Sequence, residues 1–436
     1  MAGAGAKLFT SGSVLTADQV NTYLMDQTIM KFASTSARDA AFGGAGEPSL
    51  SEGMFAYTTD TNTLWLYTGA TDGWVNVLGS DIGQQALSNR NVIINGAMQI
   101  AQRATSQASI TSSGYYTADR MNHVIGSLGT WTDSIENDAP TGSGFRKSLK
   151  FLCTTADASP ASTDIMLLRT TLEGQNVQQF LKGTASAKQF ALSFWVKSNV
   201  TGTYIAELED TDNSRAVSAS FSVSASATWE KKTITFPADT TGAFNNDNEA
   251  SLNVNLWLGC GTAYTSGSLQ TTWGTTTSAN RAVGQTNLAS AINNYWQITG
   301  VQLEAGAVAT PFEFEDYGIT LAKCQRYYQK SYLLTTAPGT NTTDGLKYLT
   351  GASNGANDVV FPIETTVGMR AAPTIGLWTA SGTSGSWQYE RSGVAATNVA
   401  SGVLFASNNG FVIYGSVGAA WVAAAYYGHY TASAEL

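Results

Sequence analysis

Histidine and cysteine are scarce in this 436-residue sequence, and their scarcity excludes several kinds of chemistry. The two histidines, His123 and His429, lie far apart in the chain, so no histidine-pair zinc motif is present and histidine general-base catalysis is not expected. The three cysteines, Cys153, Cys260 and Cys324, form no CxxC element. We expect reduced cysteines in protein cores, where free cysteine usually lies, and we predict no metal site and no cofactor.

Charged residues are also few. They make up 13% of the chain, about half of the roughly 25% found in an average soluble protein. The net charge is −9 and no basic cluster of the kind that binds nucleic acid is present. Glycines interrupt the most apolar stretch, residues 411–428, which favours buried strands over membrane insertion. The chain does not open with the apolar core of a signal peptide, so we expect it to be assembled in the cytoplasm.

The abundant residues are those of β-structure. Aromatic residues make up 11% of the chain and there are 43 glycines, and this composition with few Lys and Glu predicts a mainly β fold with many turns. Apolar and small residues alternate most clearly in residues 190–196. Further strands are expected at 203–208, 216–223, 229–236, 251–259 and 295–303 of the central region, and at 359–363, 374–379, 386–391, 410–414 and 421–427 near the end.

Six segments are expected along the chain. They are an N-terminal arm with a helix at 1–33, a small β module at 34–79, a linker at 80–90, a central jelly-roll-like β-sandwich at 91–314, a helix connector at 315–334 and a C-terminal β tip domain at 335–436. In the arm, Thr16-Ala-Asp-Gln19 fits a capping box, and the helix either docks onto another protein or folds back on its own domain. The connector helix is expected at about 320–330, with Leu321, Cys324 and Tyr328 on one face.

Several motifs resemble those of bacteriophage tail-fibre and receptor-binding proteins. The central signature comprises residues 91–103, 116–120, 295–306, 310–313 and 326–328; the N-terminal one comprises 37–41, 53–57 and 64–65; the C-terminal one comprises 361–362 and 369–373. Met121 stands where members of the family usually have Trp. The resemblance implies a carbohydrate-binding-like sandwich in a homotrimeric fibre of the virion tail. Its N-terminus would attach to the phage tail, baseplate or an adaptor protein, and its distal β domains would bind host polysaccharide or lipopolysaccharide.

The densest acidic cluster is a candidate for catalysis, because glycoside hydrolysis needs a pair of carboxylates. Glu207 and Glu209 share one side of a strand, and Asp210 and Asp212 follow in a turn. We interpret the cluster as a solvated hairpin tip, with a calcium site or catalysis as the alternatives. Because no nucleophile motif and no β-helix repeat is present, we predict no catalytic residues and no enzyme activity.

Aromatic side chains are the best candidates for glycan contacts, because a flat ring packs on the apolar face of a pyranose. Trp387, Tyr389 and Arg391 alternate and therefore share one face of a strand. The full candidate set is Trp378, Trp387, Tyr389, Arg391, Tyr426 and Tyr427 in the tip domain, with Tyr264 and Trp273 in the long central loop. The alternative for each aromatic residue is a place in the core or at a trimer interface.

A structural and adhesive fibre protein is therefore the function expected from the sequence. Two alternatives stay open. One is a tailspike enzyme that degrades polysaccharide, and the other is a head or collar fibre, or a connector, that binds no receptor.

Overall fold

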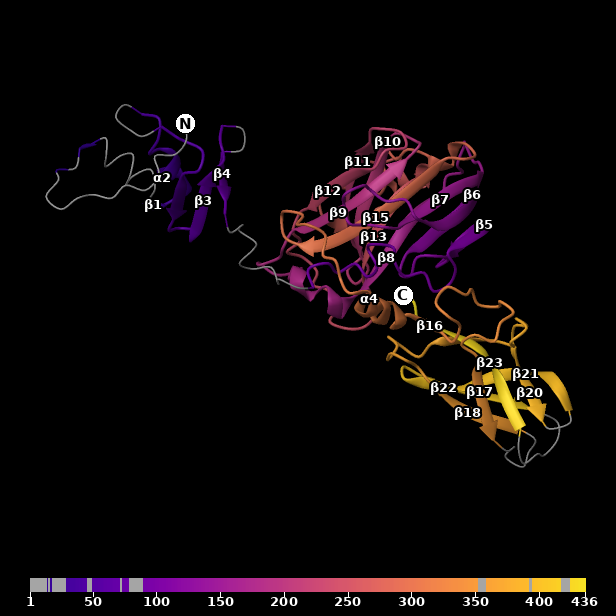
Figure 1. The fold of residues 1–436 in the computed structure, drawn as a ribbon. Helices are drawn as coiled ribbons and strands as arrows, with labels where there is room; N and C mark the ends of the chain where they lie inside the picture. Colours follow the sequence, from indigo (N-terminus) through magenta and orange to yellow (C-terminus); the bar gives the residue numbers. More distant parts are fainter. Residues whose placement is uncertain are drawn as a thin grey trace. The chain divides into compact units, whose positions relative to one another are not determined.

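The computed structural model describes residues 14, 16–17, 29–44, 49–70, 73–77, 89–351, 358–391, 394–416 and 424–436 (Figure 1). Strands dominate the described residues, so the expectation of a mainly β fold is confirmed. The chain divides into two compact units, residues 1–88 and residues 89–436. The helix expected around 16–27 and the linker expected at 80–90 lie almost wholly outside the described residues.

The first unit is a small four-stranded sheet of order β1-β2-β3-β4. Its elements are β1 (Ile29–Phe32), α2 (Thr35–Asp39), β2 (Phe55–Thr58), β3 (Thr63–Tyr67) and β4 (Trp74–Asn76). Residues 29–32, expected within the N-terminal arm, pair in parallel with β2. The Arg38 guanidinium lies 4.6 Å from the ring centre of Trp65 and 4.9 Å from that of Trp74. This buried cation–π contact holds α2 on the sheet.

The second unit begins with a sandwich made from one long, curled sheet. Its strands are β5 (Ser106–Gly114), β6 (Asn122–Glu136), β7 (Ser148–Thr155), β8 (Ile165–Glu173), β9 (Phe190–Ser198), β10 (Gly202–Asp210), β11 (Arg215–Val223), β12 (Glu230–Phe236), β13 (Ala250–Cys260), β14 (Gly274–Thr275) and β15 (Tyr295–Ala305). The order is β12-β9-β15-β7-β6-β8-β13-β10-β11-β14, with β5 beside β6. The six central strands predicted from the sequence are confirmed, and β5 to β8 and β14 are additional.

Strand β6 connects the two layers of the sandwich. Its first half pairs with β8 and its second half pairs with β7, so it passes from one layer to the other at residues 127–130. Gly129 lies at this corner with φ +72°, and a Cβ there would approach the Thr155 carbonyl oxygen to 2.6 Å. Only glycine therefore fits the bend. Between the layers lies the main core, which includes Trp131, Trp296 and Phe194 at 0% exposure.

A short helix and a second β domain follow the sandwich. Helix α4 (Tyr317–Gln325) leads to β16 (Tyr328–Lys330), β17 (Lys347–Gly351), β18 (Asp358–Glu364), β19 (Thr374–Trp378), β20 (Ser386–Arg391), β21 (Val394–Ser407), β22 (Gly410–Ser416) and β23 (Ala424–Ser433). The helix ends five residues earlier than the expected 330, because Tyr328 begins a strand that pairs with β23. Its N-cap is Asp316, whose carboxylate accepts a hydrogen bond from the Gly318 amide at 2.8 Å.

Buried ion pairs join this tip domain to the sandwich. Arg103 and Arg120 of the sandwich both bind the carboxylate of Glu435. The same guanidinium groups lie over tyrosine rings, at 3.7 Å from the ring centre of Tyr328 for Arg103 and at 3.5 Å from that of Tyr327 for Arg120. The joint therefore combines charge, hydrogen bonding and aromatic packing in a nearly dry site.

The joint generates a test with a matched control. The Glu435 side chain is 9% exposed, whereas Glu249, which also links the domains through Arg370, is 68% exposed. We expect Glu435→Ala to lower the free energy of unfolding by about 3 kcal/mol, because it leaves the buried Arg120 without a carboxylate and leaves Arg103 with only Asp119, at 3.7 Å. Glu249→Ala should cost under about 1 kcal/mol. Urea unfolding of the full chain measures both values, and equal losses would contradict this account of the joint.

Candidate functional site

The outer face of one sandwich layer carries rows of polar side chains. In the strand register, Arg169 of β8 lies opposite Asn255 of β13, which lies opposite Glu207 of β10. The next row places Asn253 opposite Glu209. Alternate residues of the same strands belong to the main core, so these five side chains point to the opposite face of the layer.

Glu207 is the fixed centre of this face. Its side chain is fully buried, and Arg281 donates to it twice, at 2.7 and 2.8 Å. The Asn255 amide donates at 2.9 Å and the Trp257 indole at 3.1 Å. Both carboxylate oxygens are thus occupied, so Glu207 holds its neighbours in place and has no lone pair directed at solvent.

Glu209 differs because one of its oxygens is open. Its Oε2 accepts from Asn253 at 3.1 Å, Asn255 at 3.2 Å and Arg169 Nη2 at 3.3 Å, and lies 3.0 Å from Arg281 Nη2. No hydrogen bond within the described residues uses Oε1. The Glu209 side chain is 17% exposed and that of Arg169 is 27% exposed. An acceptor oxygen and a guanidinium therefore face solvent side by side, in positions fixed by the network.

Electrostatics keep this carboxylate ionised. Burial alone would raise the pKa of Glu209, but the charges of Arg281 and Arg169 and the amides of Asn253 and Asn255 outweigh burial and hold that pKa below its ordinary value. A general acid for glycoside hydrolysis needs a raised pKa instead. The site is thus suited to accepting hydrogen bonds and unsuited to donating a proton.

The expectation that these acids form a solvated hairpin tip is wrong for two of them. Glu207 and Asp210 are fully buried, because β10 continues to Asp210 and cations from distant segments cover both. The Asp210 carboxylate accepts from Lys182 at 2.5 Å. Only Asp212 lies in an exposed turn, where it accepts from Asn245. Among the described residues there is no group of three His, Cys, Asp or Glu that could hold a metal.

The loop at 261–285 lies against this same layer. Tyr264, a sequence candidate, packs its ring 5.2 Å from Trp257 and is partly buried over the apolar end of the face. Trp273, the second candidate in this loop, donates to the Pro237 carbonyl at 2.8 Å and packs on Phe190. Trp273 therefore packs against the main core but stays partly exposed, and its assignment as a glycan contact stays a prediction.

Three tip-domain candidates are also core residues. Trp387 and Tyr426 are 0% exposed and Tyr389 is 6% exposed. Alternation does place Trp387 and Tyr389 on one face of β20, as expected, but that face packs into the tip core. A buried ring offers no surface to a sugar, so these three assignments are corrected. Arg391 ends β20, and its side chain lies outside the described residues.

The remaining two tip candidates share the outer face of the tip sheet. Trp378 pairs with His429, and Tyr427 lies two residues before His429 on β23. Both are partly exposed. The sequence reading missed Tyr348, which pairs with Tyr427 and is 58% exposed.

The sequence pointed to Glu207 and Glu209 of the sandwich face but not to their amide and arginine partners. Asn253 and Asn255 alternate with Val254 and Leu256 inside an otherwise apolar strand, and this pattern was a usable signal. Arg169 and Arg281 carried no local signal, because their partners lie 40 and 74 positions away along the chain.

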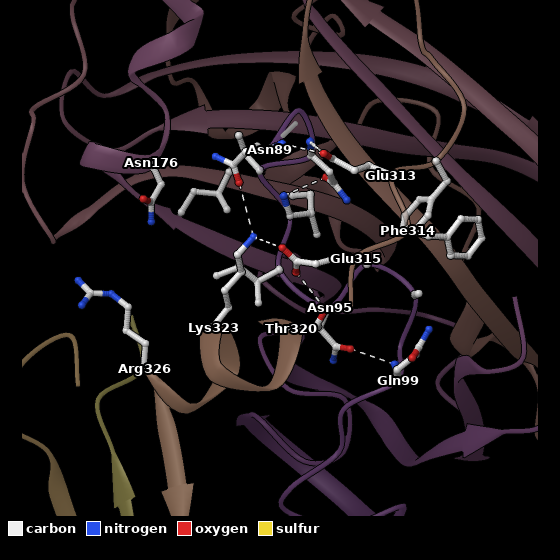
Figure 2. Close-up of a pocket in the computed structure, with 18 of the residues that line it drawn as sticks. Asn89, Asn95, Gln99, Asn176, Glu313, Phe314, Glu315, Thr320, Lys323 and Arg326 are labelled. Carbon is white, nitrogen blue, oxygen red and sulfur yellow. Dashed lines mark hydrogen bonds and ion pairs between the residues drawn. The ribbon is translucent and has the colours of Figure 1, made fainter. Parts of the chain in front are cut away.

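A cavity of about 220 Å³ lies where helix α4 meets the first residues of the sandwich. Figure 2 shows Lys323 and Thr320 of the helix directed at Glu315, with bonds of 2.5 and 3.0 Å. Glu313 accepts from the backbone amides of Asn89 and Asn91. Arg326, the remaining charged residue of the wall, pairs with Glu173. Each charged group at the wall thus has a partner within the protein, which favours a structural crevice over a ligand site.

The two histidines and the three cysteines are buried or partly buried. His123 is buried and bonds Asp133 through Nδ1 at 3.0 Å, and His429 is enclosed by Ser331, Tyr332 and the Thr342 carbonyl. Cys153 and Cys324 are buried and Cys260 is partly buried. Burial raises the pKa of the Cys260 thiol to about 12. No helix among the described residues is long and apolar enough to cross a bilayer.

Comparison with known proteins finds neither a matching family model nor a matching curated protein. Solved structures similar to this chain include the enzymatically active domain of bacteriophage CBA120 tailspike protein 4, at 15% identity over 50% of this chain and TM-score 0.27. The match covers 21% of that tailspike chain. They also include a CBM4 module, at 9% identity over 48% of this chain and 97% of the module with TM-score 0.24. A third is TmCBM61 in complex with β-1,4-galactotriose, at 10% identity and TM-score 0.25. That match covers 50% of this chain and 99% of the module. At these scores the likenesses carry no argument, and the site rests on the residues of this chain.

Because Glu207 is the buried centre of the sandwich face, two arginine variants around it should lose different amounts of stability. Arg281→Gln should lower the free energy of unfolding by about 3–5 kcal/mol, because it leaves the buried Glu207 carboxylate without its cation. Arg169→Gln, at a half-open position, should cost under about 1 kcal/mol. Urea denaturation compares them, and a larger loss for Arg169→Gln would show that the network is centred elsewhere.

The lowered pKa of Glu209 predicts a pH dependence with a defined sign. A carboxylate whose folded-state pKa lies below its unfolded value stabilises the fold above the unfolded pKa of about 4.3, and this contribution is lost as the pH falls through the folded pKa. The difference in stability between the natural chain and Glu209→Gln should thus be full above pH about 5 and shrink below pH about 4. Denaturation at a series of pH values tests this, and a difference that grows toward acid would refute it.

Proposed function

We propose that this chain is a phage fibre protein that binds saccharide on the cell surface of its host, with the outer face of the sandwich as one binding surface. The observation that carries the proposal is the solvent-facing pair of Glu209 Oε1 and the Arg169 guanidinium. A sugar presents neighbouring hydroxyl groups that both donate and accept. A fixed carboxylate and a fixed guanidinium match that pattern through charge-assisted hydrogen bonds.

Rigidity supports this assignment. Glu209 is held from three sides and Arg169 donates to Asn255 at 2.8 Å, so a ligand would not have to order these side chains on binding. The apolar end of the same face, with Trp257 beneath Tyr264, lies next to the row that holds Arg169. Sugar sites combine such apolar surface with a few placed polar groups.

The wider assignment to a phage tail rests on the resemblance of the motifs. We propose that residues 1–88 attach to a tail, baseplate or adaptor protein, that the fibre is a homotrimer, and that its place is the virion. Each site would bind weakly, and several copies on one fibre would raise the overall affinity. A protein that must attach without destroying its receptor needs no hydrolytic centre, and the ionised state of Glu209 agrees with adhesion.

Saccharide binding by the full chain tests the proposal. We expect gels containing soluble host polysaccharide to retard the natural chain, and Arg169→Gln to weaken binding about tenfold, which corresponds to the loss of one charge-assisted hydrogen bond of about 1.4 kcal/mol. Lys231→Ala serves as control, since this exposed residue lies on β12 of the opposite layer. If Arg169→Gln and Lys231→Ala were retarded equally, the binding site would have to lie elsewhere on the chain.

The absence of hydrolysis is a separate expectation. Incubation of the chain with the same polysaccharide should release no reducing ends over hours. Release that disappears in Glu209→Gln would instead assign a catalytic role to this face and favour a tailspike enzyme.

A further inference from the structure

The tip sheet has an outer face of its own, distinct from that of the sandwich. Strands β17, β23 and β20 lie side by side, so Tyr348, Tyr427 and Gln388 form one row across it. The next row holds Thr350 and Glu390 on either side of Ala425. Alternate residues such as Tyr426 point into the tip core, so both rows lie on the opposite face.

Two tyrosines on this face are stacked at the edge of the sheet. The ring centres of Tyr348 and Tyr427 are 5.4 Å apart and the planes differ by 20°. Strand β17 pairs only with β23 among the described residues. One face of the Tyr348 ring therefore packs on Tyr427, and its 58% exposure leaves the other face open to solvent.

Polar groups with spare hydrogen-bonding capacity surround the pair. The Tyr427 hydroxyl donates to Glu390 Oε2 at 3.5 Å, and no bond among the described residues uses the other oxygen of this exposed carboxylate. Gln388 accepts from the Ala380 amide through its Oε1, which leaves its NH₂ group to donate. Thr350 adds an exposed hydroxyl.

We propose that Tyr348, with Glu390 and Gln388, forms a second saccharide site, specific for neutral hexopyranose chains. It rests on the proposed function, because it assigns a further contact to the same kind of ligand. The open ring face of Tyr348 packs on the apolar face of one sugar. Gln388 lies about 10 Å away at the usual strand spacing of about 4.8 Å. That span exceeds one pyranose ring, so the site takes at least a disaccharide.

The negative charge of Glu390 favours uncharged sugars over acidic ones at this site. Glu390 is the one charged side chain that the strand register places in these two rows. Lys347 precedes Tyr348 on β17 and, by alternation, points to the other face. A uronic acid or phosphate on the ligand would meet Glu390 with no cation among the described side chains of these two rows, whereas sugar hydroxyls donate to it.

The test uses affinity electrophoresis of the full chain through soluble β-glucan, soluble β-galactan and, as the acidic counterpart, alginate. We expect a neutral polymer to retard the natural chain, Tyr348→Ala to weaken that retardation about tenfold, and Tyr348→Phe to retain it because the ring is kept. Tyr414→Ala is the matched control, since Tyr414 is a tip tyrosine of 40% exposure on β22.

Each outcome separates the two proposals. Retardation unchanged in Tyr348→Ala but lost in Arg169→Gln overturns the tip site and leaves the sandwich site standing. Stronger retardation by alginate that depends on Tyr348 overturns the assignment to neutral sugars. If none of the three polymers retards the natural chain, the tip site is overturned; the gels with host polysaccharide then decide separately whether the proposed function holds.

Discussion

The carboxylate of Glu435 is the group on which the arrangement of the second unit depends. It neutralises two arginines of the sandwich, Arg103 and Arg120, in a site from which water is almost excluded. Next to it, Gln102 bonds both the Asp119 carboxylate and the Tyr328 carbonyl. Buried charges of this kind tolerate little displacement, because each loses its partner when the domains shift. The tip domain is thereby held to the sandwich at a defined place.

Several of the motifs that resemble those of phage fibres contribute residues to this joint. Residues 99–103, 116–120 and 326–328 meet there and build the connection between the two domains. Asn91 and Asn95 likewise bond backbone groups, such as the Val301 and Ile100 carbonyls. The motifs that resemble phage fibres therefore consist of residues that hold the fold together. The residues proposed to bind sugar lie outside these motifs.

The sequence predicted the strands far better than the site. Alternation in residues 190–196 located β9, because its period is set by the local pleat. It also placed Trp387 and Tyr389 together, but it did not reveal which face of β20 is covered, since that depends on strands elsewhere in the chain. The burial of Glu207 has the same origin: its cation, Arg281, arrives from a distant loop. Tyr348 went unrecognised because β17 is short and its neighbour in the sheet, β23, lies about 80 residues further on.

The topology of the sandwich has a consequence for its synthesis. Strand β7 pairs with β15, which follows it by about 140 residues. At a translation rate of about 5–20 residues per second, the partner of β7 is made roughly 7–30 s later. Until then β7 has an exposed edge, and exposed edges invite pairing with other chains. The order in which strands leave the ribosome therefore bears on whether the nascent chain closes on itself or pairs with a neighbouring chain.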